Sequence, residues 1–317
     1  MKLAEDIYYF KGTRFNSHRG SSSNVYVIGD KQTNIIIDCG LYSYAASLKK
    51  KLLKNSISLK NNVVTFTHTH PDHVTGATIF NDKSNKFVCS RLQKDELEKP
   101  EEVYLNYIKN IKSGPYSSFA KRKTIRNILK YFFIRLYGEE GTLKIEEIIN
   151  ENTLLKNKLL VLYTPGHTLN SVAFYYEKHK ALFCGDTINT LTRGYPTLNC
   201  PDSDINKYIY TLENLKTLDV ELLCPGHNGI IFGKERIHGE LQKNIDKCLE
   251  LKRTTLNYLG NKDQSLRQLK KKVLSPFPKE FFFTTKTMMM YTILKGLIKD
   301  KKVKEIHKKV RTVYRAI

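Results

Sequence analysis

The sequence predicts a protein of the α/β class. Short runs of apolar and β-branched residues alternate with helical patterns, and several of these runs end at a histidine or an aspartate. Strand, helix and strand in succession are typical of layered α/β folds. The chain of 317 residues is long enough for one large α/β domain and a smaller one. Its 40% hydrophobic and 11% aromatic content is that of a globular protein, not a disordered one.

The first ninety residues show this alternation. Three strands are predicted at 7–10, 24–30 and 34–40, with a hairpin turn between the last two. An amphipathic helix is predicted over 41–60, with Leu48, Leu52 and Leu59 on one side. A further helix is expected at 74–80 and a returning strand at 86–89.

The segment from Val63 to His73 (VVTFTHTHPDH) predicts a strand that delivers a metal site. Alternate side chains of a strand point the same way, so His68 and His70 can share one ion. Pro71 ends the strand, which leaves Asp72 and His73 in the following turn, where they can face a second ion. Imidazole and carboxylate ligands suit zinc, iron, cobalt or manganese.

Three further motifs each place one potential ligand after a predicted strand. They are the Thr-Pro-Gly-His that ends at His167, the Cys-Gly-Asp that ends at Asp186, and the Cys-Pro-Gly-His that ends at His227. The four motifs together resemble the signature of the metallo-β-lactamase superfamily, which is HxHxDH followed by Gly-His, Gly-Asp and Gly-His.

This resemblance implies a four-layered αββα fold, hydrolytic activity and two divalent metal ions. Zinc is the expected metal, with iron or manganese as alternatives. Two such ions can hold a bridging hydroxide as the nucleophile, and Asp72 and Asp186 are the expected catalytic residues. By matching motif positions, one ion is assigned to His68, His70 and His167, the other to Asp72, His73 and His227, and Asp186 bridges them.

Asp38 closes the strand predicted at 34–40. In the resembled superfamily an aspartate here lies behind the metal-binding histidines, so Asp38 is expected to orient an imidazole. A helix or turn cap is the alternative.

The segment 90–150 is predicted to be a largely helical insertion, and in the resembled superfamily such an insertion lies near the mouth of the active site. The segment contains a basic cluster, 109–135, with eight basic and no acidic residues, interleaved with aromatic residues. Such a pattern is typical either of stacking on single-stranded nucleic acid or of a helical core.

The region 202–231 predicts a capped helix, starting at Ser203 or Asp204, and the strand before His227. The catalytic domain is thus expected to span 1–233, and a basic, mainly helical domain 234–317. Helices are predicted at 239–259, at 266–274 after a Ser265 cap, and after Thr285. Three helices and a tail resemble the winged-helix-like domain of the β-lactamase-like endoribonuclease branch. The spacing of apolar residues in 303–317 is helical, however, whereas a wing requires a β-hairpin.

The net charge of +22 is confined to two segments, because 109–135 and 234–317 together account for all of it. Such segregation, with a pI near 9.6, favours an anionic partner, nucleic acid before membrane. The candidate phosphate contacts are Lys270, Lys271, Lys272, Lys301, Lys302, Lys304, Lys308 and Lys309. Packing on the catalytic domain or homodimerisation is the alternative role of the C-terminal segment.

The cysteines and the N-terminus predict a cytoplasmic protein. Six cysteines without a CxxC pair fit reduced thiols, and no apolar run approaches a membrane span. No signal peptide is evident. Cys184 and Cys224, two and three residues before predicted ligands, are candidates for contacts with the metal site.

The function predicted from these observations is phosphodiester cleavage of RNA at a dinuclear metal site. The first alternative is hydrolysis of a thioester or small ester, as by glyoxalase II, although 187–200 lacks the Gly-Cys-Gly-Arg pattern expected there. The second is a nucleic-acid-binding regulator whose metal site is vestigial; the complete ligand set argues against it.

Overall fold

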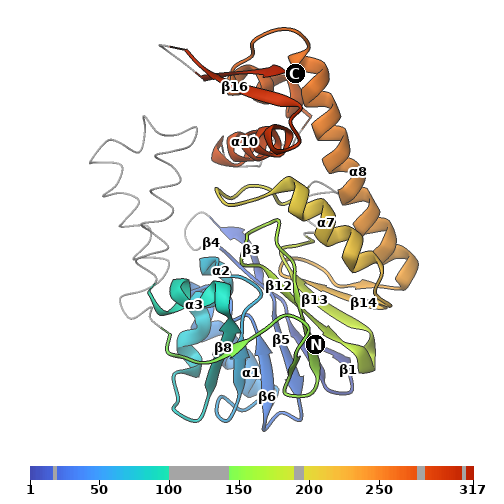
Figure 1. The fold of residues 1–317 in the computed structure, drawn as a ribbon. Coiled ribbons are helices and arrows are strands. Elements are labelled where there is room, and N and C mark those ends of the chain that lie inside the picture. Colours follow the sequence, from blue (N-terminus) through green and yellow to red (C-terminus); the bar gives the residue numbers. More distant parts are fainter. Residues whose placement is uncertain (17–19, 100–142, 189–195, 277–282, 309–311) are drawn as a thin grey trace.

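Two β-sheets packed face to face form the centre of the protein, shown in the computed structural model of Figure 1. The structure describes residues 1–16, 20–99, 143–188, 196–276, 283–308 and 312–317. The first sheet has, in spatial order, β1 (Lys2–Ala4), β2 (Ile7–Phe10), β5 (Val25–Gly29), β6 (Asn34–Ile37), β7 (Val63–Thr65), β8 (Lys86–Ser90) and β9 (Ile145–Ile149). The second has β10 (Leu154–Leu155), β11 (Leu159–Tyr163), β12 (Val172–Tyr176), β13 (Ala181–Gly185), β14 (Leu222–Pro225) and β15 (Ile231–Phe232).

Alternation along the strands divides the hydrophobic core into layers. In β5, Tyr26 and Ile28 face the second sheet, whereas Val25 and Val27 face the opposite way, into a separate cluster. The ring of Tyr26 meets that of Phe183 edge-on, with centroids 5.1 Å apart, in the layer between the sheets. Both faces of each sheet are therefore covered.

Short helices cover the outer face of the first sheet. They are η1 (Tyr42–Tyr44), α1 (Ala45–Lys54), α2 (Pro71–Val74), η2 (Thr75–Phe80) and α3 (Arg91–Glu98). Leu48 and Leu52 of α1 pack into the outer cluster as the periodicity predicted, but α1 ends at Lys54 rather than near residue 60. The helix predicted at 74–80 is a 3₁₀-helix, and α2 precedes it because Pro71 is suited to a first helical turn.

Helices α7 (Ile205–Lys216) and α8 (Lys234–Leu259) cover the outer face of the second sheet. Helices α9 (Leu266–Val273) and α10 (Phe283–Lys299) pack against α8, and α10 also contacts α7. Asp204 caps α7 by accepting from the amides of Asn206 and Lys207, and Ser265 forms a capping box with Gln268 at α9. Leu182 of β13, Tyr208 of α7, Leu241 of α8 and Leu294 of α10 belong to one hydrophobic cluster. The four-layered αββα architecture with a helical C-terminal region is confirmed.

The tail is a hairpin rather than a helix. β16 (Val303–His307) pairs antiparallel with β17 (Thr312–Ala316), in register from Val303 with Ala316 to His307 with Thr312. Val303, Val313 and Tyr314 are buried in this hairpin. Figure 1 shows α10 between the hairpin and the sandwich.

The insertion and the N-terminal hairpin differ from the prediction. The start of the segment 90–150 is helical, as α3, but its end is a strand, since β9 pairs parallel with β8 and buries Ile145 and Ile149. The basic cluster 109–135 and its aromatic residues lie outside the described residues. A short hairpin of β3 (Thr13–Asn16) and β4 (Gly20–Ser22), not predicted, lies next to the ligand-bearing turn, with α2 close to β4. Within the part of the chain that the structure describes, no helix combines the length and the apolar character needed to cross a membrane.

Candidate metal centre

The seven predicted ligands converge at one end of the sandwich. His68 and His70 follow β7, and Asp72 and His73 lie in α2. The other three come from the second sheet: His167 from the loop after β11, Asp186 after β13 and His227 after β14. Because β13 and β14 are parallel, they deliver Asp186 and His227 to the same edge.

The first group joins the two sheets. Nε2 of His68 lies 2.8 Å from Nδ1 of His70, and that same Nδ1 lies 3.2 Å from Nε2 of His167. Potential ligand atoms of these three side chains lie within 4.8 Å of one another. They are the three residues assigned to one ion from the sequence.

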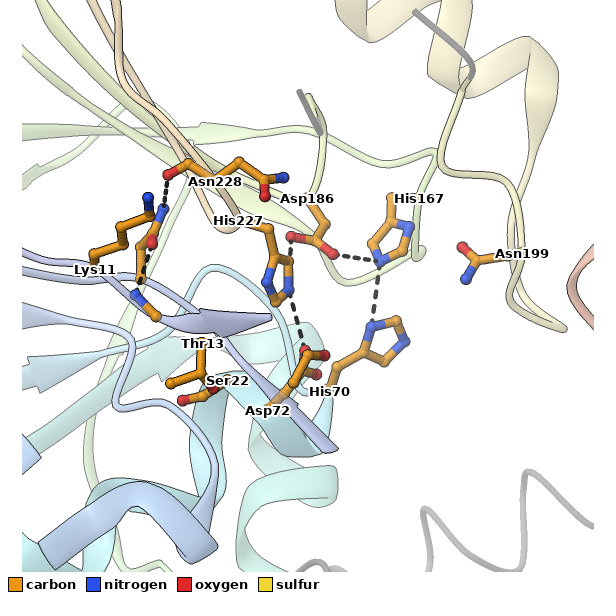
Figure 2. Close-up of a pocket in the computed structure, with 13 residues that line it drawn as sticks. Lys11, Thr13, Ser22, His70, Asp72, His167, Asp186, Asn199, His227 and Asn228 are labelled. Atoms are coloured by element: carbon orange, nitrogen blue, oxygen red, sulfur yellow. Dashed lines mark hydrogen bonds and ion pairs between the residues drawn. The ribbon is translucent and has the colours of Figure 1, made fainter. Parts of the chain in front are cut away.

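The second group contains Asp72, His73 and His227, whose potential ligand atoms also lie within 4.8 Å of one another. Nε2 of His227 lies 3.1 Å from Oδ2 of Asp72. Asp186 lies between the two groups: its Oδ2 is 3.8 Å from Nε2 of His167, and its Oδ1 is 3.6 Å from Nε2 of His227 (Figure 2).

Two buried polar atoms in this cluster lack a hydrogen-bond partner among the described residues. They are Nε2 of His73 and Oδ1 of Asp186, 3.4 Å apart. Buried polar atoms are almost always satisfied, and both of these are good ligand atoms for a divalent cation. A Cβ at Gly226 would lie 2.5 Å from Oδ1 of Asp186 and 2.6 Å from Cε1 of His73, so the backbone here admits only glycine. The His and Asp clusters fit a dinuclear metal centre.

Asp38 lies behind the centre, where the sequence placed it. Its Oδ2 accepts a hydrogen bond of 2.8 Å from Nδ1 of His73, which directs Nε2 into the site. The same carboxylate accepts from the amide and the hydroxyl of Thr67, the residue before His68. Asp38 itself has φ +59°, a left-handed conformation that aspartate tolerates better than most residues.

On the opposite side, backbone and thiol groups orient the imidazoles. Nδ1 of His167 donates to the carbonyl of Thr197 over 2.6 Å, which leaves Nε2 for the site. Nε2 of His70 lies 3.3 Å from Sγ of Cys200. Cys184 and Cys224, the expected candidates, are buried in the core, and the thiol of Cys184 points to the carbonyls of Gly185 and Cys224. The sequence offered no signal for Thr197, since a carbonyl is common to every residue.

The electrostatics divide the imidazoles of the cluster into two kinds. Burial lowers the pKa of His68, whereas the charges of Asp38 and Asp186 outweigh burial at His73 and raise its pKa. Burial and the neighbouring His167 lower the pKa of His70 to about 4. Burial alone would raise the pKa of Asp72, but the hydrogen bond from His227 and the charge of His73 outweigh it and lower the value to about 2. The pKa of Asp186 likewise lies well below its usual range, because His227 and His73 outweigh the effect of burial.

A polar cavity opens onto the centre. Its volume is about 290 Å³, and Figure 2 shows residues that line it. Besides five of the predicted ligands, it is lined by Lys11, Gly12, Thr13, Ser21, Ser22, Asn24, Asn199 and Asn228. These eight were missed from the sequence, because the N-terminal hairpin and two distant loops meet only in the folded chain.

Comparison with known proteins identifies the family. The model of the metallo-β-lactamase superfamily matches residues 18–227, which is more than half of the chain. The chain therefore belongs to the metallo-β-lactamase superfamily, and it is a metal-binding hydrolase by family and by site.

Individual relatives are distant. The chain is 26% identical over 215 residues to the probable metallo-hydrolase MJ0888 of Methanocaldococcus jannaschii, covering 67% of this chain and 90% of that one. It is 23% identical over 263 residues to the acyl-coenzyme A thioesterase MBLAC2 of Bos taurus, covering 78% and 86%. The crystal structure of the metallo-β-lactamase family protein TTHA1429 of Thermus thermophilus shares the fold with a TM-score of 0.75 at 15% identity, over 99% of this chain and 100% of that one.

The candidate phosphate-contacting lysines are separate from the cavity. Lys271, Lys272, Lys301, Lys302 and Lys304 are exposed, at the end of α9 and near the tail hairpin. Lys270 donates to the hydroxyl of Thr287, and Lys308 pairs with Asp263 at 2.8 Å. Lys309 lies outside the described residues.

Proposed function

We propose that the protein cleaves phosphodiester bonds of RNA at a dinuclear metal centre. The observation that carries this proposal is the lining of the cavity above the ligands. Apart from the predicted metal ligands, the described residues that line it contribute no aliphatic or aromatic side chain; they contribute amides, hydroxyls and the ammonium group of Lys11. A pocket for an acyl chain is mostly apolar, whereas phosphate oxygens accept hydrogen bonds from groups of this kind.

The seven ligands divide as the motif positions indicate. His68, His70 and His167 would hold one cation and Asp72, His73 and His227 the other. Asp186, between the groups, would contact both. When bound, two divalent cations polarise the scissile bond and activate water at neutral pH.

The remaining groups hold this constellation and the substrate. Asp38 fixes the ring of His73, and the carbonyl of Thr197 fixes that of His167, so both present Nε2 without rotating. Lys11 lines the cavity and forms no ion pair with a described residue, so its ammonium group is available to a phosphate oxygen.

The C-terminal region supports an anionic polymer as substrate. Helices α8, α9 and α10 followed by the hairpin of β16 and β17 have the element types of a winged-helix-like domain. The exposed lysines Lys271, Lys272, Lys301, Lys302 and Lys304 would contact phosphates of a bound strand outside the cavity, as would Lys309. Such contacts make binding weaken as the salt concentration rises.

Hydrolysis of a thioester on an anionic carrier is the second candidate function. The acyl-coenzyme A thioesterase of Bos taurus matches over 78% of this chain, and a carrier with phosphate groups would suit the same positive charge. The polar cavity favours a short or polar acyl group in that case.

The test is cleavage of a labelled single-stranded RNA by the metal-reconstituted protein, beside Asp186→Ala, at low and moderate salt. We expect the wild type to cut the RNA and the variant to bind it without cutting. A short-chain acyl-coenzyme A is assayed in parallel. If the chain binds two ions but leaves the RNA intact and hydrolyses the thioester, the nuclease proposal is wrong and thioester hydrolysis takes its place.

A further inference from the structure

A second, smaller cavity lies beside the metal cavity, on the side of α1. The two share Lys11, Gly12, Thr13 and Ser22 as lining residues. Thr13 of β3 pairs with Ser22 of β4, so the base of this hairpin forms a wall common to both cavities. Lys51 and Ser47 of α1 line the far side of the smaller cavity.

The charge of the smaller cavity is positive. Lys11 and Lys51 are both exposed, and neither forms an ion pair with a residue that the structure describes. No acidic residue is found among the described residues that line this cavity. Two lysines without ion pairs among the described residues line the same space, and their charge favours an anion there. The lining is completed by Phe10, Val25, Cys39, Tyr44 and Leu48.

Two hydroxyls at this cavity lack a partner in the described structure. Ser23 lines it and is only 1% exposed, yet its Oγ makes no hydrogen bond. Oγ1 of Thr13 is likewise buried and unpartnered. Among the described residues, Ser22 accepts from the amide of Leu41 at 2.9 Å and donates to no group, so its proton is available to a ligand. Buried hydroxyls are rarely left unsatisfied, and three hydroxyl donors beside two lysines match the oxygens of one anionic group.

We propose that this smaller cavity is a phosphate-binding subsite, which holds a phosphate of the substrate next to the bond cleaved at the metal centre. The assignment of this phosphate to RNA rests on the proposed function, whereas the subsite is inferred from the cavity alone. The volume of the cavity, about 30 Å³, is room for about two water-sized groups, so it admits oxygens of a phosphate but not a nucleobase.

The position of the subsite gives the substrate a direction. Figure 2 shows Lys11, Thr13 and Ser22 on the side of Asp72 and His227, with His70 and His167 beyond them. A strand with one phosphate at the subsite therefore passes Asp72 and His227 before it reaches His70 and His167.

The experiment compares Lys51→Gln and Ser23→Ala with Lys50→Gln, which removes an exposed lysine of α1 that lines neither cavity. Two substrates are used with the metal-loaded protein: a short RNA and bis(p-nitrophenyl) phosphate, which has a single phosphate. We expect Lys51→Gln to raise KM for RNA at least fivefold more than it raises KM for the small diester. Ser23→Ala should act in the same direction without lowering the melting temperature, because it removes an unsatisfied hydroxyl. Lys50→Gln should alter neither substrate's KM by more than twofold.

A binding measurement separates this inference from the nuclease proposal. Fluorescent RNA, and coenzyme A against pantetheine, are titrated into metal-loaded Asp186→Ala protein with and without Lys51→Gln. If no RNA is cut but Lys51→Gln weakens coenzyme A binding and not pantetheine binding, the subsite stands and its phosphate belongs to a thioester carrier. If Lys51→Gln and Ser23→Ala match Lys50→Gln with every ligand, the subsite is refuted, whether or not RNA is cut.

Discussion

The two ends of the β-sandwich differ in whether their polar side chains have hydrogen-bond partners. At the metal end, Nε2 of His73 and Oδ1 of Asp186 are buried without hydrogen bonds in the described structure. At the far end, Asp6, just before β2, accepts a hydrogen bond of 2.7 Å from the hydroxyl of Tyr176, and its Oδ1 lies 2.6 Å from Nε2 of His179. Both clusters join the first sheet to the second. The metal end leaves polar atoms available to a ligand, whereas the far end uses them to hold the two sheets together. Substitutions at the metal end should therefore mainly lower activity, and substitutions at the far end should mainly lower stability.

The largest effect is expected for Asp186→Ala. This variant removes a carboxylate that lies near ligands of both groups, and the loss of several kcal/mol of transition-state stabilisation corresponds to at least about a thousandfold in kcat/KM. The metal-free variant should lose no more than about 2 kcal/mol of unfolding free energy, because the attraction of Asp186 to His73 and His227, at 3.4 and 3.6 Å, is partly offset by the cost of burying its charge. Metal content, kcat/KM and the free energy of unfolding are measured for both proteins. A large loss of stability would contradict the difference proposed between the two ends.

Asp38→Asn is expected to give an intermediate effect. Asparagine tolerates the left-handed conformation at this position, but it lacks the charge that holds the ring of His73. Groups that orient metal ligands contribute roughly 10–100-fold to metal affinity or activity. Titration with a metal-buffered chelator measures the affinity, and unchanged affinity would show that Asp38 serves only the backbone turn.

The smallest effect on activity, and a clear one on stability, is expected for Asp6→Asn. At pH 7 the variant should lose about 1–2 kcal/mol of unfolding free energy, with activity within about twofold of the wild type. Burial alone would raise the pKa of the Asp6 carboxyl, but hydrogen bonds from Tyr176 and His179 lower it. The contribution of Asp6 is therefore complete above the unfolded-state pKa of about 3.9 and is lost as the pH falls through the lower folded-state value.

Denaturant unfolding of wild type and Asp6→Asn between pH 7 and pH 3 tests this sign. The difference between the two proteins should shrink toward acidic pH. A difference that grows toward pH 3, or a large loss of activity at pH 7, would mean that the two ends do not act separately.

Local patterns explain which parts could be predicted from the sequence. The HxHxDH turn lies within six residues, and the caps at Asp204 and Ser265 depend on side chains next to their helices. The turn and Ser265 were therefore identified, and the first cap was narrowed to Ser203 or Asp204. The strand β9 was missed because the pattern of Ile145–Ile149 (IEEII) is not an alternating one, and its pairing with β8 is tertiary. The structure of the tail was ambiguous because the spacing of its apolar residues suits a helix. In the folded chain the tail is a hairpin, because β16 pairs with β17.

The site shows the same division. Every predicted ligand lies in the cluster, since a strand end followed by a short motif is a local signal. Lys11, Asn199 and Asn228 come from three separate loops, so only the folded chain brings them together around the cavity. Cys200 meets His70 across 130 positions of sequence, which no spacing rule anticipates.

Three contacts of α10 connect the C-terminal region of this chain to the metal centre through one loop. Nζ of Lys295 donates to the carbonyl of Pro201, Lys299 pairs with the cap residue Asp204, and Gly296 leaves no room for a Cβ beside Ile205. The loop held in this way includes Cys200, beside His70. A chimera that receives a foreign C-terminal region must therefore also receive the loop and α7 that match it, or its metal centre will change along with its surface.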